Sequence, residues 1–224
     1  MDKLVRPSAK IRVFLGVDFS RIKNIIFDLG DVIINIDPTK TYAAFARLTD
    51  QPLDQTLERF NELQVFQRYE RGEFTDTEFI QFLRDELVLT QSDEVVIEAW
   101  NQILLDIPKE RIEIIQSLKG KYRLFLLSNT SNIHILETCN ILRETTGVKR
   151  LHDLFEITFL SYEMKLSKPD HAIYHEVLRQ AEIEPHETLF LDDNADNIRA
   201  AGEVGIQTIH VIKPTSIVNY LADA

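Results

Sequence analysis

Short apolar runs that alternate with helical stretches constrain the fold of this chain more than any other feature of its sequence. Four of these runs lie in the second half of the 224 residues and are typical of buried strands, at 122–127, 155–160, 188–191 and 207–211. Helical patterns separate them. Because strand–helix–strand units favour parallel pairing, the sequence predicts an α/β fold, a three-layer sandwich with a parallel sheet.

An earlier apolar run is predicted to belong to the same sheet. Ile25, Ile26 and Phe27 indicate a short buried strand, and this run ends abruptly in Asp28. Parallel α/β sheets bind their ligands at the carboxyl ends of their strands, where a carboxylate is readily accommodated. Taken alone, Asp28 is explained equally well as the first residue of a turn.

The stretch between the first strand and residue 122 has a helical pattern. Apolar residues recur at helical spacing from about 39 to 119, and Thr75-Asp76-Thr77-Glu78 has the form of a capping box. We expect about four helices here, with the last one leading back to the sheet. The predicted organisation is an N-terminal extension at 1–23, forming a leader or an extra strand, an α/β core at 24–38 and 109–224, and an inserted helical cap at 39–108.

Composition narrows the range of partners. The net charge of −11 argues against a nucleic acid or an anionic membrane as the main partner. Asp18 interrupts the apolar patch at 13–17, so a signal peptide is not expected, and no apolar run approaches membrane-spanning length. Cys139 is the single cysteine and is expected to pack within a helix. We therefore expect a cytoplasmic monomer or weak homodimer that binds a small molecule.

Polar residues follow several predicted strands at the same place. They are Asp28, Ser128 with Asn129, Lys168 in a loop, and Asp192 with Asp193. Each group has an ordinary explanation, as a helix cap, a solvated lysine or a turn. Parallel topology, however, would gather all of them on one edge of the sheet. Three carboxylates, a hydroxyl, an amide and an ammonium suit phosphoryl chemistry, because they offer oxygen ligands for Mg²⁺, a nucleophile and donors to phosphate.

The order of these motifs resembles the haloacid dehalogenase-like hydrolase superfamily over roughly residues 24–212. The motifs are Phe-Asp-Leu-Gly-Asp-Val at 27–32, Leu-Ser-Asn-Thr at 127–130, Ser-Lys-Pro-Asp at 167–170 and Leu-Asp-Asp-Asn-Ala-Asp-Asn at 191–197. The helical insert after the first motif is similar to that of members with an α-helical cap. The stretches 69–74 and 192–197 resemble the bacterial α-glucose-1-phosphate phosphatase type.

The resemblance implies a Mg²⁺-dependent phosphatase that hydrolyses a small phosphorylated metabolite, a sugar phosphate, through an aspartyl-phosphate intermediate. Asp28 would be the nucleophile and Lys168 its catalytic partner. The remaining implied roles are phosphate binding by Ser128, Asn129 and Lys168, and metal binding by Asp28, Gly30, Asp192 and Asp193. Asn197 would orient the metal ligands.

Gly30 departs from the family pattern, since phosphatases of the superfamily carry a second aspartate there as general acid/base. The proton for the leaving group would then come from Asp31, from the cap or from water, or the substrate would have a good leaving group, as a sugar 1-phosphate does. Within the cap, Tyr69, Glu70 and Arg71 are candidates for a segment near the site. Two other functions stay open. One is a haloacid dehalogenase-type hydrolase, which needs no metal and is disfavoured by the paired aspartates, and the other is a catalytically silent binding module.

Overall fold

A parallel sheet forms the centre of the computed structural model, which describes residues 17–222 and 224. Its five strands are β1 (Asn24–Phe27), β2 (Arg123–Ser128), β3 (Ile157–Leu160), β4 (Thr188–Asp192) and β5 (Gln207–His210), and they lie in the order β3-β2-β1-β4-β5. All four pairings are parallel. The central strand β1 is buried along its whole length, as its unbroken apolar run predicts.

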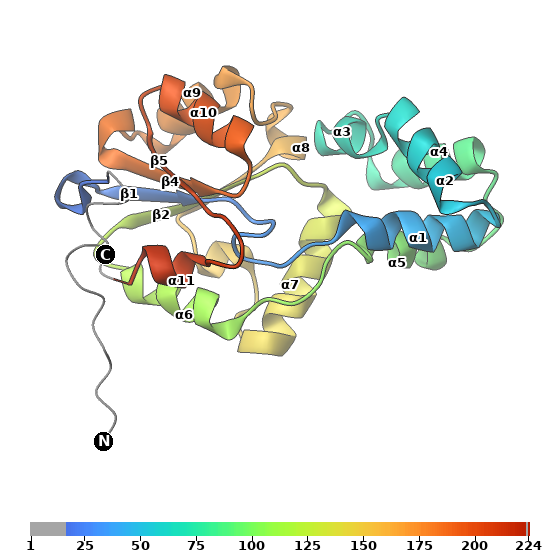
Figure 1. The fold of residues 1–224 in the computed structure, drawn as a ribbon, viewed down its shortest axis with the longest axis horizontal. Coiled ribbons are helices and arrows are strands. Elements are labelled where there is room, and N and C mark those ends of the chain that lie inside the picture. Colours follow the sequence, from blue (N-terminus) through green and yellow to red (C-terminus); the bar gives the residue numbers. More distant parts are fainter. Residues whose placement is uncertain (1–16, 223) are drawn as a thin grey trace.

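Helices cover both faces of the sheet (Figure 1). One face carries α6 (Lys109–Leu118), α7 (Asn132–Thr146) and α11 (Ile217–Tyr220), and the other carries α9 (His171–Ala181) and α10 (Ala195–Glu203). Side chains of β1 alternate between these layers. Ile25 and Phe27 pack on the α6 side and Ile26 on the α9 side. Cys139, on α7, packs against the first of these layers. The predicted three-layer α/β sandwich is confirmed.

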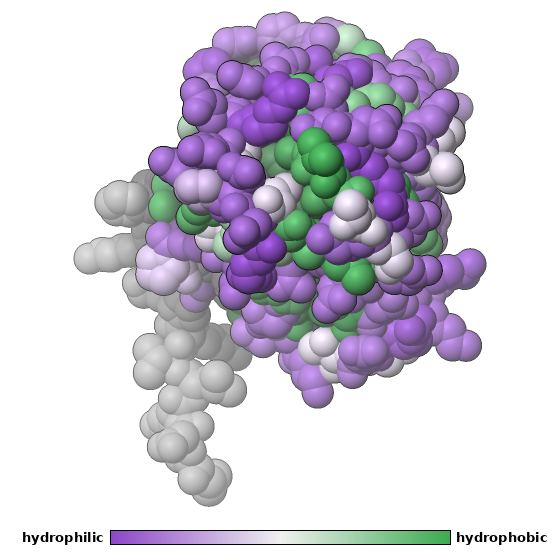
Figure 2. Space-filling model, turned by 90° about the vertical axis from the view of Figure 1, so that its right-hand side faces the viewer, coloured by the Kyte–Doolittle hydropathy of each residue, from purple (hydrophilic) through white to green (hydrophobic). Residues whose placement is uncertain are grey.

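An all-helical cap lies beyond the carboxyl ends of the strands, on the right in Figure 1. It consists of α1 (Pro38–Thr49), α2 (Leu53–Glu62), α3 (Val65–Glu70), α4 (Asp76–Leu87) and α5 (Asp93–Asn101). Its core is largely aromatic, with Phe45, Phe60, Phe79 and Trp100 fully buried. The capping box at Thr75 starts α4 as predicted. Seen from its free end, the cap is mostly hydrophilic around a small apolar patch (Figure 2).

The cap rests on the beginning of α7, directly after β2. The Trp100 ring of α5 stacks on His134, with ring centroids 4.8 Å apart and an interplanar angle of 2°. The Asn132 side chain donates a 2.7 Å hydrogen bond to Asp76 of α4. This junction joins the cap to the segment that follows the Ser128–Asn129 motif.

Several predicted elements differ from the observed ones. Six helices, α1 to α6, lie between β1 and β2, two more than the four or so that the sequence suggests. One of them, α3, has only six residues and shows too little periodicity to be recognised. The short helix α8 (Ser161–Met164) was also not predicted. In the described part of the 1–23 extension, Phe19–Arg21 form a 3₁₀ helix rather than a strand, and residues 1–16 lie outside the described residues. The segment boundaries at 23, 38 and 108 stay predictions. None of the described helices is both long enough and apolar enough to cross a membrane.

Candidate active site

The register of the sheet brings the predicted site residues to one edge. Phe27, the last residue of β1, pairs with Leu126 of β2 and with Leu191 of β4. The next residue, Asp28, donates its backbone N–H to the Leu191 carbonyl at 2.9 Å. Because the three strands run parallel, the residues that end them meet at their carboxyl ends. Asp28, Ser128 and Asp192 are therefore neighbours.

Lys168 lies at the centre of this group. Its Nζ donates to Asp28 Oδ1 at 2.6 Å, to Asp192 Oδ2 at 2.7 Å and to the Leu127 carbonyl at 3.0 Å. Its side chain is only 2% exposed. Burial alone would lower the pKa of Lys168, but Asp28 and Asp192 raise it well above its usual value. The lysine is therefore a fixed cation among the carboxylates.

The side chain of Asn129 positions the loop that carries Lys168. Asn129 Nδ2 donates to the Lys168 carbonyl, and Asn129 Oδ1 accepts from the Lys168 N–H, both at 2.9 Å. The family resemblance implies a phosphate-binding role for Asn129 through its backbone amide, and this contact of the side chain is an additional role. Nothing in the local sequence signals the role of the side chain, because its partner lies 39 residues away.

Asp192 is completely buried and fully engaged in hydrogen bonds. Its Oδ1 accepts from the Asn194 N–H at 2.8 Å and from Asn197 Nδ2 at 3.1 Å. Its Oδ2 accepts from Asn197 Nδ2 at 3.0 Å and from Lys168. Three donor groups make these four contacts, which fill the usual capacity of a carboxylate. Asp192 thus anchors Lys168, and Asn197 orients Asp192 as the sequence suggests.

The carboxylates have the geometry and charge that suit a divalent cation. One oxygen from each of Asp28, Asp192 and Asp193 lies within 4.8 Å of the others. Burial raises the pKa of Asp28 to about 7 against the opposing charge of Lys168, and burial together with Asp192 raises the pKa of Asp193 to about 6. A bound cation would relieve this crowding. Asp28 and Asp193 retain free oxygens, and no hydrogen bond to the Gly30 carbonyl occurs within the described part of the chain.

Ser128 offers a hydroxyl beside the nucleophile candidate. The residue is 2% exposed, and its Oγ makes only a long 3.3 Å hydrogen bond to the adjacent Asn129 carbonyl. The backbone N–H of Thr130, two residues after Ser128, is already bonded to Ser161 Oγ at 2.9 Å. The Ser128 hydroxyl is therefore able to turn toward an anion placed between Asp28 and Lys168.

Comparisons with known proteins agree with this geometry. The sequence model of the family described as haloacid dehalogenase-like hydrolase matches residues 22–205. The chain is 32% identical over 187 residues to the D-ribitol-5-phosphate phosphatase of Bacteroides thetaiotaomicron, covering 84% of this chain and 90% of that protein. This chain belongs to the haloacid dehalogenase-like hydrolases.

Solved structures of the same family have the same fold. A family enzyme from Bacteroides thetaiotaomicron, in complex with magnesium and inorganic phosphate, superposes with a TM-score of 0.80 at 34% identity, covering 89% of this chain and 98% of that one. A predicted haloacid dehalogenase-like hydrolase from Porphyromonas gingivalis gives a TM-score of 0.81 at 27% identity, with 90% and 97% coverage. The inserted helical cap is part of this shared architecture.

In this haloacid dehalogenase-like hydrolase, contacts within and beyond the turn after Asp28 hold Asp31. Asp31, a predicted candidate for the general acid, has a positive φ of 53°. Its carboxylate accepts from the Ile36 N–H at 3.1 Å and pairs with Lys213 at 2.7 Å. Two donors outside the carboxylate cluster therefore hold Asp31. Gly30 does not have a positive φ, and a Cβ there would lie 3.0 Å from Ile36 Cδ1.

The three cap candidates in this hydrolase have different surroundings. Tyr69 is 1% exposed, stacks on Phe79 and donates its hydroxyl to Asp76, so it belongs to the cap core. Arg71 is exposed. Glu70 is half-buried, and the charge of Lys168 acts on its carboxyl group. The described residues contain no ion pair between Glu70 and Arg71.

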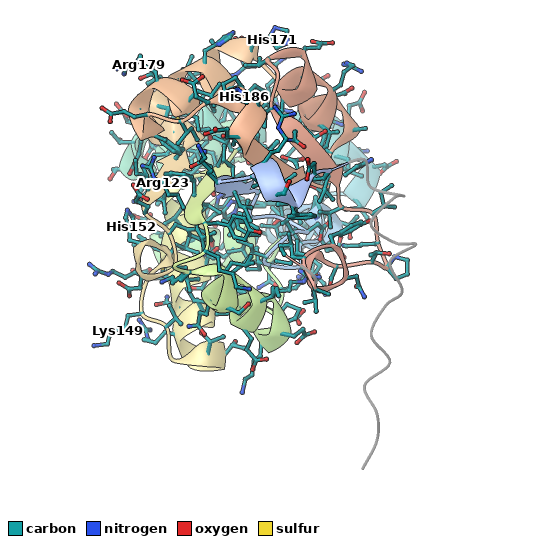
Figure 3. All side chains as sticks on the ribbon, turned by 90° about the vertical axis from the view of Figure 1, so that its left-hand side faces the viewer. Arg123, Lys149, His152, His171, Arg179 and His186 are labelled. Atoms are coloured by element: carbon teal, nitrogen blue, oxygen red, sulfur yellow. The ribbon has the colours of Figure 1, made fainter. Side chains whose placement is uncertain are left out.

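Basic residues on the side away from the cap lie apart from one another. Figure 3 labels Arg123, Lys149 and Arg179, which come from different elements of the hydrolase core. Arg123 pairs with Glu156, and Arg179 pairs with Glu176.

Proposed function

We propose that this hydrolase is a Mg²⁺-dependent phosphatase of small phosphorylated metabolites and that Asp28 forms an aspartyl-phosphate. The observation that carries the proposal is the buried contact of Lys168 Nζ with both Asp28 and Asp192, beside Asp193. The relatives support it, since one is named a phosphatase and another was solved with magnesium and phosphate.

In the first proposed step, a carboxylate oxygen of Asp28 attacks phosphorus, and the bond from phosphorus to the leaving oxygen breaks. Lys168 holds Asp28 Oδ1, which leaves the other oxygen free to attack. Ser128 and the Asn129 amide donate to the phosphate oxygens. Lys168, whose three N–H bonds are taken by Asp28, Asp192 and the Leu127 carbonyl, supplies positive charge beside them. In the second step, a water attacks the phosphorus and frees Asp28. The bound Mg²⁺ would be held by Asp28, Asp193 and the Gly30 carbonyl, with Asp192 behind them, and supplies positive charge beside the phosphate.

The charge of the site favours this cation. Three carboxylates and one ammonium leave two net negative charges where a phosphate dianion must bind. Like charges at such distances repel strongly when they are shielded from water. A dehalogenase attacks carbon in a 2-haloacid, which carries one negative charge rather than two, and it needs no metal. The cluster therefore favours phosphatase activity over dehalogenase activity.

The substrate we propose is a sugar phosphate, in the broad sense that includes sugar alcohols. The relative named for D-ribitol 5-phosphate supports this class. In that compound the leaving group is an ordinary alcohol, so a protonating group is needed more than for a sugar 1-phosphate. The narrower α-glucose-1-phosphate assignment, a cytoplasmic location and a monomer or weak homodimer stay predictions from the sequence.

The test is a panel of phosphorylated metabolites assayed with Mg²⁺ and with EDTA. We expect phosphate release from sugar and sugar-alcohol phosphates that EDTA abolishes and Mg²⁺ restores. Release of halide from 2-haloacids in EDTA would favour the dehalogenase. No turnover of any phosphate ester, with binding of phosphorylated compounds retained, would favour the silent binding module.

A further inference from the structure

This inference rests on the proposed phosphatase function and concerns the proton that the leaving group needs. Gly30 offers no carboxyl at the family's usual position, and Asp31 is held by Ile36 and Lys213. An alkoxide leaves slowly without a proton, and a positioned acid typically contributes about 10²–10⁴-fold. With Asp31 Oδ1 already bonded to the Ile36 N–H and paired with Lys213, a carboxyl of the cap is the next candidate to supply it.

A clamp fixes the end of cap helix α3 to the core. Ser161 Oγ, at the end of β3, donates to the Glu70 carbonyl at 2.6 Å while it accepts from the Thr130 N–H at 2.9 Å. One buried hydroxyl thus joins the backbone of Glu70 to the residue two positions after Ser128. While these two hydrogen bonds of Ser161 are intact, the backbone of Glu70 stays next to the motif at 127–130.

Two further contacts hold the same segment. Lys165 Nζ donates to the Gly72 carbonyl at 2.5 Å. Gly72 has a φ of +64°, and any Cβ there would collide with the Tyr162 carbonyl and the Lys165 ammonium. The backbone of 70–72 therefore lies directly against α8 and the residue that follows it, at the same edge of the sheet as Asp28.

The Glu70 carboxyl is the acidic group that this clamp presents. No hydrogen bond to its side chain occurs among the described residues. Burial raises the pKa of Glu70 to about 7, opposed by the charge of Lys168. The carboxyl is thus within electrostatic reach of the site and able to exchange a proton near neutral pH.

We propose that Glu70 is the catalytic acid and base of this enzyme, in place of the absent carboxyl at Gly30. When the Asp28–phosphorus bond forms and the phosphorus–alkoxide bond breaks, the Glu70 proton moves to the alkoxide oxygen. In the second step, the Glu70 carboxylate takes a proton from the attacking water as the Asp28–phosphorus bond breaks. Glu70 ends protonated, and phosphate is released.

The experiment compares two esters of similar size in single-turnover assays with Mg²⁺. p-Nitrophenyl phosphate has a leaving group that departs without a proton, whereas benzyl phosphate releases an alkoxide. For Glu70→Gln we expect release of benzyl alcohol to fall about 10²–10⁴-fold, and release of p-nitrophenol to change by less than about tenfold. Glu70→Asp should recover part of the loss on benzyl phosphate.

The matched control is Glu73→Gln in the same segment, where the carboxylate is exposed and pairs with Arg68. Both rates should stay near those of the wild type. Equal losses of Glu70→Gln on the two esters would show a positioning role, and no loss would place the acid elsewhere. Either result overturns the inference while leaving the phosphatase intact. A wild type that hydrolyses neither ester would overturn both proposals.

Discussion

Asp28 combines burial with an essential charge. Burial raises its pKa to about 7, and the Lys168 contact opposes that shift. A carboxylate in this position is poorly solvated and available to attack. We predict that Asp28→Asn lowers phosphate release by on the order of 10³-fold or more, because the amide cannot act as the nucleophile.

The variant should fold, since an amide oxygen can still accept the Lys168 hydrogen bond. Phosphate release at saturating Mg²⁺ and circular dichroism are the measurements. Near-normal turnover by a folded Asp28→Asn variant would contradict the aspartyl-phosphate mechanism.

Position 30 allows a carboxyl group to be added back where other phosphatases of the family carry one. The φ of Gly30 is not positive, and a new Cβ would meet only the flexible end of Ile36, at 3.0 Å. In the Glu70→Gln background, we predict that Gly30→Asp restores hydrolysis of benzyl phosphate by about tenfold or more, because it places a carboxyl at the family's usual position. Gly30→Ala in the same background is the control, and an equal gain from Ala would show that the effect is not acid catalysis.

At the scale of elements, the contact between α3 and α8 positions the end of α3 beside the carboxyl ends of the strands. Gly72→Ala should disrupt it, since the position combines a φ of +64° with a collision against Tyr162. We predict a loss of at least about 1–2 kcal/mol in unfolding free energy and a fall in activity on the order of 10²-fold, because a small displacement of a catalytic group is costly.

The control for this prediction is Gly120→Ala, at the end of α6. Gly120 has a φ of +83°, but nothing lies within 4 Å of an added Cβ. This variant should lose similar stability through its backbone and keep its activity. Chemical unfolding and steady-state kinetics test both variants, and equal activities for the two would contradict the clamp.

At the scale of the whole molecule, the carboxylate cluster links stability to metal and pH. The folded pKa values of Asp28 and Asp193, about 7 and about 6, lie above the ordinary 3.8. Without metal, the folded state therefore binds more protons than the unfolded state between about pH 4 and about pH 7. The contribution of these two groups to the free energy of unfolding falls as the pH rises through that range. Mg²⁺ binds the ionised carboxylates, so its stabilisation should appear over the same range.

We predict that Mg²⁺ at about 100 times its Kd raises Tm by roughly 5–10 °C at pH 8 and by much less at pH 5. Asp193→Asn should remove most of this shift. Asp196→Asn should not, because Asp196 is exposed on α10 and pairs with Arg199. Thermal unfolding at the two pH values is the measurement, and a shift that is independent of pH would argue against a carboxylate metal site.

The layers of this protein, and the edge of the sheet where its polar residues gather, could be predicted from the amino-acid sequence alone. Burial makes a strand such as β1 an unbroken apolar run, and its abrupt end in Asp28 marks the carboxyl edge. Parallel topology then implies that Asp28, Ser128 and Asp192 meet there. Helical periodicity revealed most of the cap but missed the short helix α3. These features follow from local patterns, which is why they could be predicted.

The hydrogen-bond and ion-pair partners of the polar side chains became known only from the folded structure. Asp31 turns to Lys213, Asn129 holds the Lys168 loop, and Ser161 fixes Glu70 across 91 residues of sequence. Each contact depends on how two segments that are distant in the sequence pack together. The residues next to either partner in the sequence therefore do not predict the contact. The sequence thus showed that one carboxyl is absent at Gly30, whereas the proposal that Glu70 replaces it rests on the packing of α3 against the core.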